Sequence, residues 1–284
     1  MSESPKTAPR PIGPDWPFTA AFCLIGSLYL ALIVAMVVAD SAFTSPAKIA
    51  EALSSREIHY SIKLSLISCT ISALLSLVVA VPLGYLLSRY EFRGKSLVDT
   101  TLDIPIVLPP LVIGLSLLIL FQVKIAGQSI DEWLRSQFHF PVTYAIPSVI
   151  LAQFAVACAF AVRTMRVTFE QINPRNEQVA LTLGCTRSQA FWRVVLPEAR
   201  RGVLTAATLA WARSLGEFGP ILIFSGATRM KTEVLSTTVF LELSVGNLEA
   251  AVAVSLLMIA VALVVLLLVR FLGAEAAFGK ALRP

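Results

Sequence analysis

An arginine and a glutamate stand four residues apart inside an otherwise uncharged run of the chain. Arg213 and Glu217 are the only charged residues between positions 202 and 228. On a helix this spacing places both side chains on one face, where they can approach each other. A charge at the centre of a membrane costs about 2.5–3.5 kcal/mol, so such residues are expected to pair or to face water.

Two interpretations of this pair stay open. In the first, Arg213 and Glu217 form a purely structural ion pair between membrane helices. In the second, they line a path for an anion, and Gly216 and Gly219 leave room for it because they carry no side chains. Arg213 would then attract the anion, and Glu217 would keep it from being held too tightly.

No other residues suggest catalysis or metal binding. His59 and His139 are isolated, and the four cysteines include no Cys-x-x-Cys pair. The run at positions 94–96, Gly-Lys-Ser, resembles the end of a phosphate-binding loop, but Arg89 stands where that motif needs its first glycine. We therefore predict no catalytic residue, no metal and no cofactor bound by this chain. Any ATP hydrolysis that drives it must occur in another chain.

The composition predicts a helical membrane protein. Of the 284 residues, 56% are hydrophobic and only 14% are charged, and the mean hydropathy is +0.78. A soluble domain has about a quarter of its residues charged. Because about twenty apolar residues cross a bilayer as a helix, six spans are expected. They lie at about 16–39, 64–88, 102–123, 142–166, 202–224 and 249–270, between a disordered tail at 1–15 and a C-terminal tail at 271–284.

The distribution of basic residues predicts that both termini are cytoplasmic. With six spans and the termini inside, fifteen Lys and Arg residues fall on the cytoplasmic side and seven on the outer side. Such a bias is typical of cytoplasmic loops. The net charge of +5 is thereby explained without nucleic acid as a partner.

The third expected span contains two consecutive prolines. Pro109 and Pro110 each remove a backbone donor, so we expect them to kink the helix. Freed carbonyls are tolerated in a membrane where they face protein or a water-filled path. The kink could serve packing alone, or it could help to shape a pathway near a dimer axis.

The cytoplasmic loop at 170–200 carries signals for two short helices. Asn173 and Pro174 are typical of a helix start, and Gly184 is typical of a helix end. Thr186 opens a capping box, and Pro197 is expected to end the second helix. Its apolar face consists of Ala190, Phe191, Val194 and Val195. The loop is either an ordinary ordered connection or a docking element that offers this face to a cytoplasmic partner.

This loop resembles the EAA loop of ABC-importer permeases. That family has Glu-Ala-Ala, three residues, Gly, nine residues and then Ile-x-Leu-Pro. Aligned on Gly184, this chain has Gln178-Val179-Ala180, its glutamate stands one position earlier at Glu177, and Leu196-Pro197 falls at the expected spacing. Two further stretches, residues 102–110 and 212–219, resemble the permeases for molybdate, tungstate and sulfate.

The resemblance implies the type I importer permease fold, with six transmembrane helices, permease domain 16–270 and coupling helices between spans 4 and 5. It implies an ATP-driven importer of a tetrahedral oxyanion, with molybdate or tungstate first and sulfate next. ATPase coupling would fall to Glu177, Gln178, Ala180, Gly184, Leu196 and Pro197, and the translocation pathway to Pro109, Pro110, Arg213, Gly216, Glu217 and Gly219.

The same resemblance implies the partners and the location. The partners are a second permease copy, two cytoplasmic ATPase subunits that use ATP and Mg, and a periplasmic or lipid-anchored oxyanion-binding protein. The location is the inner membrane of a bacterium or archaeon.

Two other classes of protein remain as alternatives. A secondary transporter working alone usually has internal repeats and several intramembrane carboxylates. The sequence shows no convincing repeat, and Glu217 is its only carboxylate well inside a span. A membrane enzyme would need a cluster of catalytic side chains at one depth, which two lone histidines do not supply.

Overall fold

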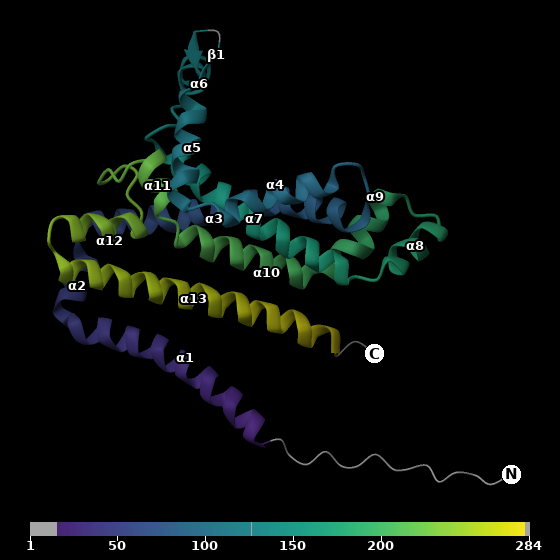
Figure 1. Ribbon diagram of the computed structural model, residues 1–284, viewed down its shortest axis with the longest axis horizontal. Coiled ribbons are helices and arrows are strands. Elements are labelled where there is room, and N and C mark those ends of the chain that lie inside the picture. The colour runs from purple at the N-terminus through teal and green to yellow at the C-terminus, as the bar shows by residue number, and fades with distance from the viewer. Residues whose placement is uncertain (1–15, 126, 282–284) are drawn as a thin grey trace. The chain divides into compact units, whose positions relative to one another are not determined.

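The chain is almost entirely helical, as its composition predicts (Figure 1). The computed structural model describes residues 16–125 and 127–281. The expected tail at 1–15 lies outside the described residues. Of the expected tail at 271–284, residues up to 281 belong to a helix.

The first helix belongs to a separate unit of the structure. Helix α1 (Trp16–Phe43) lies in the unit that ends at Ser45, and all later elements lie in the unit that begins at Pro46. Apolar side chains cover α1 on all sides, and nearly all of its described residues are exposed. A helix that is apolar all round and unburied by its own unit is suited to a lipid surrounding.

The described part of the second unit consists of helices, two short strands and one π-turn. The elements are α2 (Pro46–Ser54), α3 (Arg56–Arg89), α4 (Lys95–Val107), α5 (Pro110–Gln122), β1 (Lys124–Ile125), β2 (Gln128–Ser129), α6 (Ile130–Phe138), α7 (Ile146–Gln171), α8 (Pro174–Thr182), α9 (Arg187–Ala190), η1 (Phe191–Val195), α10 (Leu196–Leu215), α11 (Gly219–Phe224), α12 (Leu235–Ser244) and α13 (Leu248–Ala281). Strands β1 and β2 pair antiparallel.

Among the described residues, four helices are long and apolar enough to cross a membrane. They are α1, α3, α7 and α13, and the pair α4–α5 counts as a fifth if it forms one broken span. Helix α10 is not among them, because it carries Arg200, Arg201 and Arg213 as well as Glu198. The all-helical membrane fold is confirmed, and the count of six spans stays a prediction.

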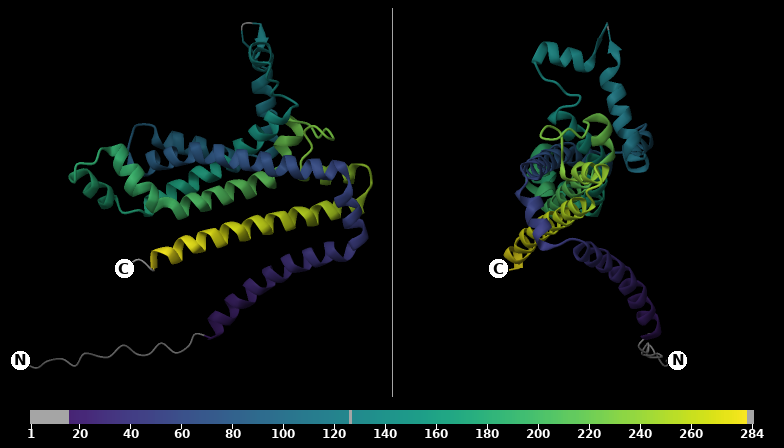
Figure 2. Two further views of the ribbon diagram at one scale, coloured as in Figure 1. Left: turned by 180° about the vertical axis from the view of Figure 1, so that it is seen from behind. Right: turned by 90° about the vertical axis from the view of Figure 1, so that its left-hand side faces the viewer.

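Helices α3, α7 and α10 lie side by side and form the core (Figures 1 and 2). The buried face of α3 is built from small residues, mainly serine, alanine and glycine. Small residues let helix backbones approach closely in a membrane. At Gly84 an added Cβ would lie 2.8 Å from the Cβ of Met165 on α7, so only glycine fits there.

Two of the expected spans are broken rather than continuous. The expected span at 102–123 falls on α4 and α5, which meet at an angle of 112° at Leu108-Pro109. The expected span at 202–224 falls on α10 and α11, with a break at residues 216–218. The prolines were expected to kink one helix, but they separate two helices, because Pro110 is the first residue of α5.

Candidate functional site

The two helix breaks meet where α5 packs on α11. An added Cβ at Gly114 would lie 2.6 Å from the Cα of Pro220, and one at Gly219 would lie 3.0 Å from the amide nitrogen of Leu111. Side chains at either glycine would push the helices apart. The structure therefore brings Gly219 together with the Pro109–Pro110 break.

Arg213 and Glu217 form an ion pair beside these breaks. A nitrogen of the Arg213 guanidinium lies 2.5 Å from Oε2 of Glu217. The expected approach of the two side chains is confirmed, but its expected cause, a shared helix face, is wrong. Helix α10 ends at Leu215, with Gly216 as its C-cap, so Glu217 lies on the link to α11.

The two members of the pair differ in exposure. The Glu217 side chain is 1% exposed, whereas that of Arg213 is 28% exposed. The guanidinium of Arg213 also lies over the ring of Phe160 on α7, 5.7 Å from its centroid. At Gly216 an added Cβ would meet only backbone oxygens at 3.8 Å or more. Arg213 thus presents a partly exposed positive charge, which the buried Glu217 neutralises from one side.

A buried polar group adjoins the pair and was not predicted. Gln153 of α7 donates from Nε2 to the carbonyl oxygen of Ser214 at 3.3 Å, and the Ser214 hydroxyl lies 3.1 Å from that of Ser72. Oε1 of Gln153 has no hydrogen-bond partner among the described residues. The signal was available, since Gln153 is a lone amide inside the apolar run 140–162.

The loop at 170–200 folds largely as predicted. The Asn173 side chain caps α8, and Thr186 and Gln189 form the capping box of α9. Gly184 follows the end of α8 with a φ of +88°. This left-handed conformation is the one that glycine adopts without strain.

The expected helix end at Pro197 is wrong. Helix α9, the π-turn η1 and α10 follow one another without a break, and Pro197 lies in the first turn of α10. A proline inside a helix normally clashes with the carbonyl four residues earlier. The wider turn at Phe191–Val195, where the amide of Leu196 donates to the carbonyl of Phe191, accommodates it.

The apolar surface of this loop is also different from the expected one. Ala190 and Val195 are completely buried, and Phe191 packs against the core, so this face points into the protein itself. The large apolar side chains that the loop exposes are those of Val179, Leu183 and Trp192, with exposed fractions of 56%, 80% and 64%. A docking surface would consist of these three residues.

Glu177 connects the loop to α3. Its Oε1 accepts a hydrogen bond of 2.5 Å from the Tyr85 hydroxyl, and its Oε2 lies 3.6 Å from Nε of Arg89. Within α8, the Ala180 side chain is buried, whereas the Gln178 side chain is exposed. Leu196 is half-buried and Pro197 is exposed. Glu177, which stands one position before the glutamate of the family pattern, thus connects α8 to Tyr85 and Arg89 of α3.

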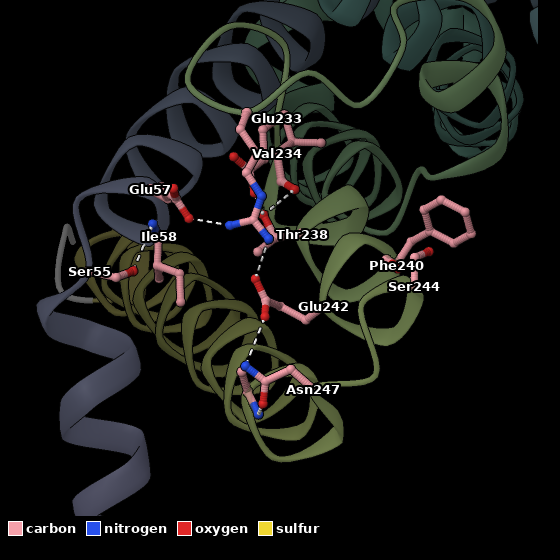
Figure 3. Close-up of polar contacts among 12 residues, drawn as sticks. Ser55, Glu57, Ile58, Glu233, Val234, Thr238, Phe240, Glu242, Ser244 and Asn247 are labelled. Carbon is pink, nitrogen blue, oxygen red and sulfur yellow. Dashed lines mark hydrogen bonds and ion pairs between the residues drawn. The ribbon is translucent and has the colours of Figure 1, made fainter.

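A second charged cluster lies at the start of α3 and was not predicted. Arg229 pairs with Glu57 and, at 2.8 Å, with Glu242, which accepts a hydrogen bond from Asn247 (Figure 3). Glu233 is completely buried beside them, and burial raises its pKa above the ordinary value. The cluster lines a cavity of about 280 Å³. Short-range sequence patterns could not reveal it, because its members come from distant segments.

The described residues contain no group of three or more His, Cys, Asp or Glu side chains that could hold a metal ion.

The chain is similar to a family of known transport proteins. Residues 80–276 match the family described as "Binding-protein-dependent transport system inner membrane component". The sulfate transport system permease protein CysT of Escherichia coli is 33% identical over 89% of this chain and 89% of its own length. The probable molybdenum ABC transporter permease protein of Haloferax volcanii is 34% identical over 86% and 85%.

A solved structure shares the fold. It is that of a bacterial ABC transporter involved in the import of the acidic polysaccharide alginate. The match has a TM-score of 0.68 at 18% sequence identity and covers 92% of this chain and 98% of that one.

Proposed function

Because the chain belongs to the family of binding-protein-dependent transport system inner membrane components, we propose that it is the permease of an ATP-driven importer for a tetrahedral oxyanion. Molybdate or tungstate is the first candidate and sulfate the next. Like its relatives, the chain is a transport subunit and not itself an enzyme. Family membership favours this function over a secondary transporter working alone.

The observation that carries the proposal is the ion pair of Arg213 and Glu217 beside two helix breaks. Unwound backbone in a membrane is tolerated where it is buried in protein or lines a water-filled cavity. The half-buried guanidinium of Arg213 supplies the charge that a dianion needs, and Glu217 limits how tightly the dianion is held. Two relatives have sulfate or molybdenum in their names, which supports an anion as the transported substance.

The coupling element consists of α8, α9 and η1. Its exposed apolar residues Val179, Leu183 and Trp192 are suited to a hydrophobic cleft on an ATPase subunit. Two such subunits would use ATP and Mg and would dock on two permease copies. A periplasmic or lipid-anchored binding protein would deliver the oxyanion from the outer side, in an inner membrane with both permease termini in the cytoplasm.

The test is uptake by the reconstituted complex. The permease is purified with its ATPase and binding protein and placed in proteoliposomes, and uptake of labelled molybdate, tungstate and sulfate is measured with and without ATP. We expect ATP-dependent uptake of one of these anions and its loss with an ATPase subunit that cannot hydrolyse ATP. Uptake by the permease alone would support a secondary transporter, and failure to transport any of the three would overturn the oxyanion assignment.

A further inference from the structure

A groove lined by both charged and apolar side chains runs between α7 and α10. It has a volume of about 600 Å³ and is lined on the α10 side by Glu198, Arg201, Gly202, Thr205 and Leu209, and on the α7 side by residues from Phe160 to Gln171. An added Cβ at Gly202 would lie 2.1 Å from a Thr168 side-chain carbon, so the two helices are in direct contact at the floor of the groove.

The groove leads from Arg213 toward one end of α10. Arg201, Thr205 and Leu209 line the groove at intervals of four residues, and Arg213, which is outside its lining, follows Leu209 after four more. Because each interval turns the row by about 40°, Arg213 lies about 120° around the helix from Arg201. Phe160, whose ring lies under the Arg213 guanidinium, lines the same groove. Twelve residues of α-helix span about 18 Å, slightly more than half of the hydrocarbon thickness of about 30 Å.

The charge of the groove is positive at its far end. Arg201 is exposed there, and Arg163 of α7 lines the same space with 63% of its side chain exposed. Glu198 is the acidic residue in the lining, so Arg163 and Arg201 leave it with a formal charge of +1, and Asp103, outside the lining, pairs with Arg163. Asp103 lies 3.4 Å from Arg163, and Glu198 accepts hydrogen bonds from Asn176 of α8 at 3.0 and 3.2 Å.

We propose that this groove is the cytoplasmic exit path of the transported anion, in which Arg201 and Arg163 receive the dianion after it passes Arg213. The inference rests on the proposed function and on cytoplasmic termini. An anion that leaves Arg213 for a cell interior of negative potential moves against the electrical force on it, and a positive groove lowers this barrier. The contact of Glu198 with Asn176 also places the exit beside the coupling element.

Thiol labelling tests the groove directly. In a background without native cysteines, Thr205→Cys is introduced into the complete reconstituted complex. Its rates of reaction with an anionic and a cationic methanethiosulfonate reagent of similar size are then compared. A positive groove is expected to raise the ratio of anionic to cationic rates by roughly tenfold or more. Adding the transported oxyanion should slow the anionic reagent.

Three further variants show whether Arg201 is the cause. Arg201→Gln should abolish most of the preference, and Arg201→Lys should retain it. Arg93→Gln, which changes another exposed arginine assigned to the cytoplasmic side, should leave it unchanged. Equal rates for the two reagents, a preference that Arg201→Gln does not alter, or no reaction with either reagent would each overturn the proposal.

Transport separates this inference from the proposed function. If the wild-type complex imports an oxyanion but Thr205→Cys shows no anion preference, the exit path is wrong and the function stands. If the groove prefers anions but none of molybdate, tungstate and sulfate is imported, the oxyanion function fails and this groove is not its exit path.

Discussion

Tyr85 and Glu177 are 92 positions apart in the sequence, yet the Tyr85 hydroxyl donates a hydrogen bond of 2.5 Å to the Glu177 carboxylate. The Tyr85 ring also packs edge-on against Phe169 and Phe191, with centroids 5.7 and 4.8 Å apart. One side chain of α3 thereby contacts the end of α7, helix α8 and the π-turn η1. The orientation of the coupling element depends on this tyrosine.

Tyr85→Phe should weaken coupling without preventing insertion. The change removes a hydrogen bond to a charged acceptor, which contributes about 1.5–3 kcal/mol, and keeps the ring contacts. We expect normal amounts in the membrane and a several-fold lower ATPase activity of the assembled complex when it imports its cargo. Tyr90→Phe, at a neighbouring exposed position, is the matched control. If both variants behave alike, the hydroxyl of Tyr85 has no special role.

Gly184→Val should abolish transport while leaving the protein inserted. Nothing lies within 4 Å of an added Cβ at Gly184, so the effect comes from the φ of +88° and not from a clash. The left-handed conformation costs an ordinary residue roughly 1–2 kcal/mol and a β-branched one more. Co-purification with the ATPase measures the outcome, and Gly184→Asn should be milder because asparagine tolerates this conformation. Normal transport by Gly184→Val would exclude a pivot at this position.

Gly114→Ala should destabilise the contact of α5 with α11. Its new methyl group would lie 2.6 Å from the Cα of Pro220, which belongs to the backbone and cannot rotate away. Overpacking of this kind costs about 1–3 kcal/mol. Thermal unfolding of this variant in detergent should show a lower midpoint. Gly26→Ala on α1, where nothing lies within 4 Å of an added Cβ, should not lower the midpoint. An unchanged midpoint for Gly114→Ala would mean that the two helices do not pack this closely.

Arg213→Gln should slow oxyanion transport while the complex still assembles and hydrolyses ATP. Glu217→Gln should instead strengthen retention of the anion, since it leaves the Arg213 charge unopposed. Each single change leaves a charged group without its partner, so some loss of stability, up to about 3–5 kcal/mol for a fully buried pair, accompanies it.

The double variant Arg213→Gln/Glu217→Gln separates the two interpretations of this pair. It should regain stability, because no buried charge is left unpaired, and it should still transport poorly. Recovery of both stability and transport in the double variant would show that the pair is structural only.

Asp131 should make the segment around α6 sensitive to acid. Partial burial opposes ionisation, but N–H groups of Thr143 and Val142 and the nearby Arg135 together lower the pKa of Asp131. A lowered pKa in the folded state gives stability that is present above the unfolded pKa of about 3.9 and is lost as the pH falls below it. In the wild type, the thermal unfolding midpoint should therefore decrease as the pH is lowered below about 4. Asp131→Asn should show a smaller drop, and an equal drop in both proteins would contradict this role.

Local signals predicted the coupling element well and its surface poorly. The caps at Asn173, Thr186 and Gly184 depend on residues a few positions apart, so the sequence contains their cause. Which face of α9 points outward depends on α3 and α7, which no local pattern describes. Val195 and Phe191, which the docking interpretation placed on a surface for a partner, therefore pack in or against the core instead.

In the candidate pathway, too, local signals were predictable from the sequence and contacts between distant segments were not. The two prolines indicated a kink, and the charges of Arg213 and Glu217 indicated a polar site in the membrane, but no sequence pattern indicated the break at residues 216–218. The cluster around Arg229 escaped prediction because Glu57 lies 172 positions away from it. Gln153 carries no charge, so the pattern of charged residues did not indicate it.

The uninterrupted helix from Arg187 to Leu215 gives this protein a lever. One end carries Trp192 on the surface available to an ATPase, and the other end carries Arg213. Trp192 and Arg213 are 21 positions apart, about 32 Å along a helix, so a tilt of about 10° about one of them displaces the other by about 5–6 Å. With an ATPase subunit docked at Trp192, as proposed, a movement of that subunit would reach Arg213 through this one continuous helical segment.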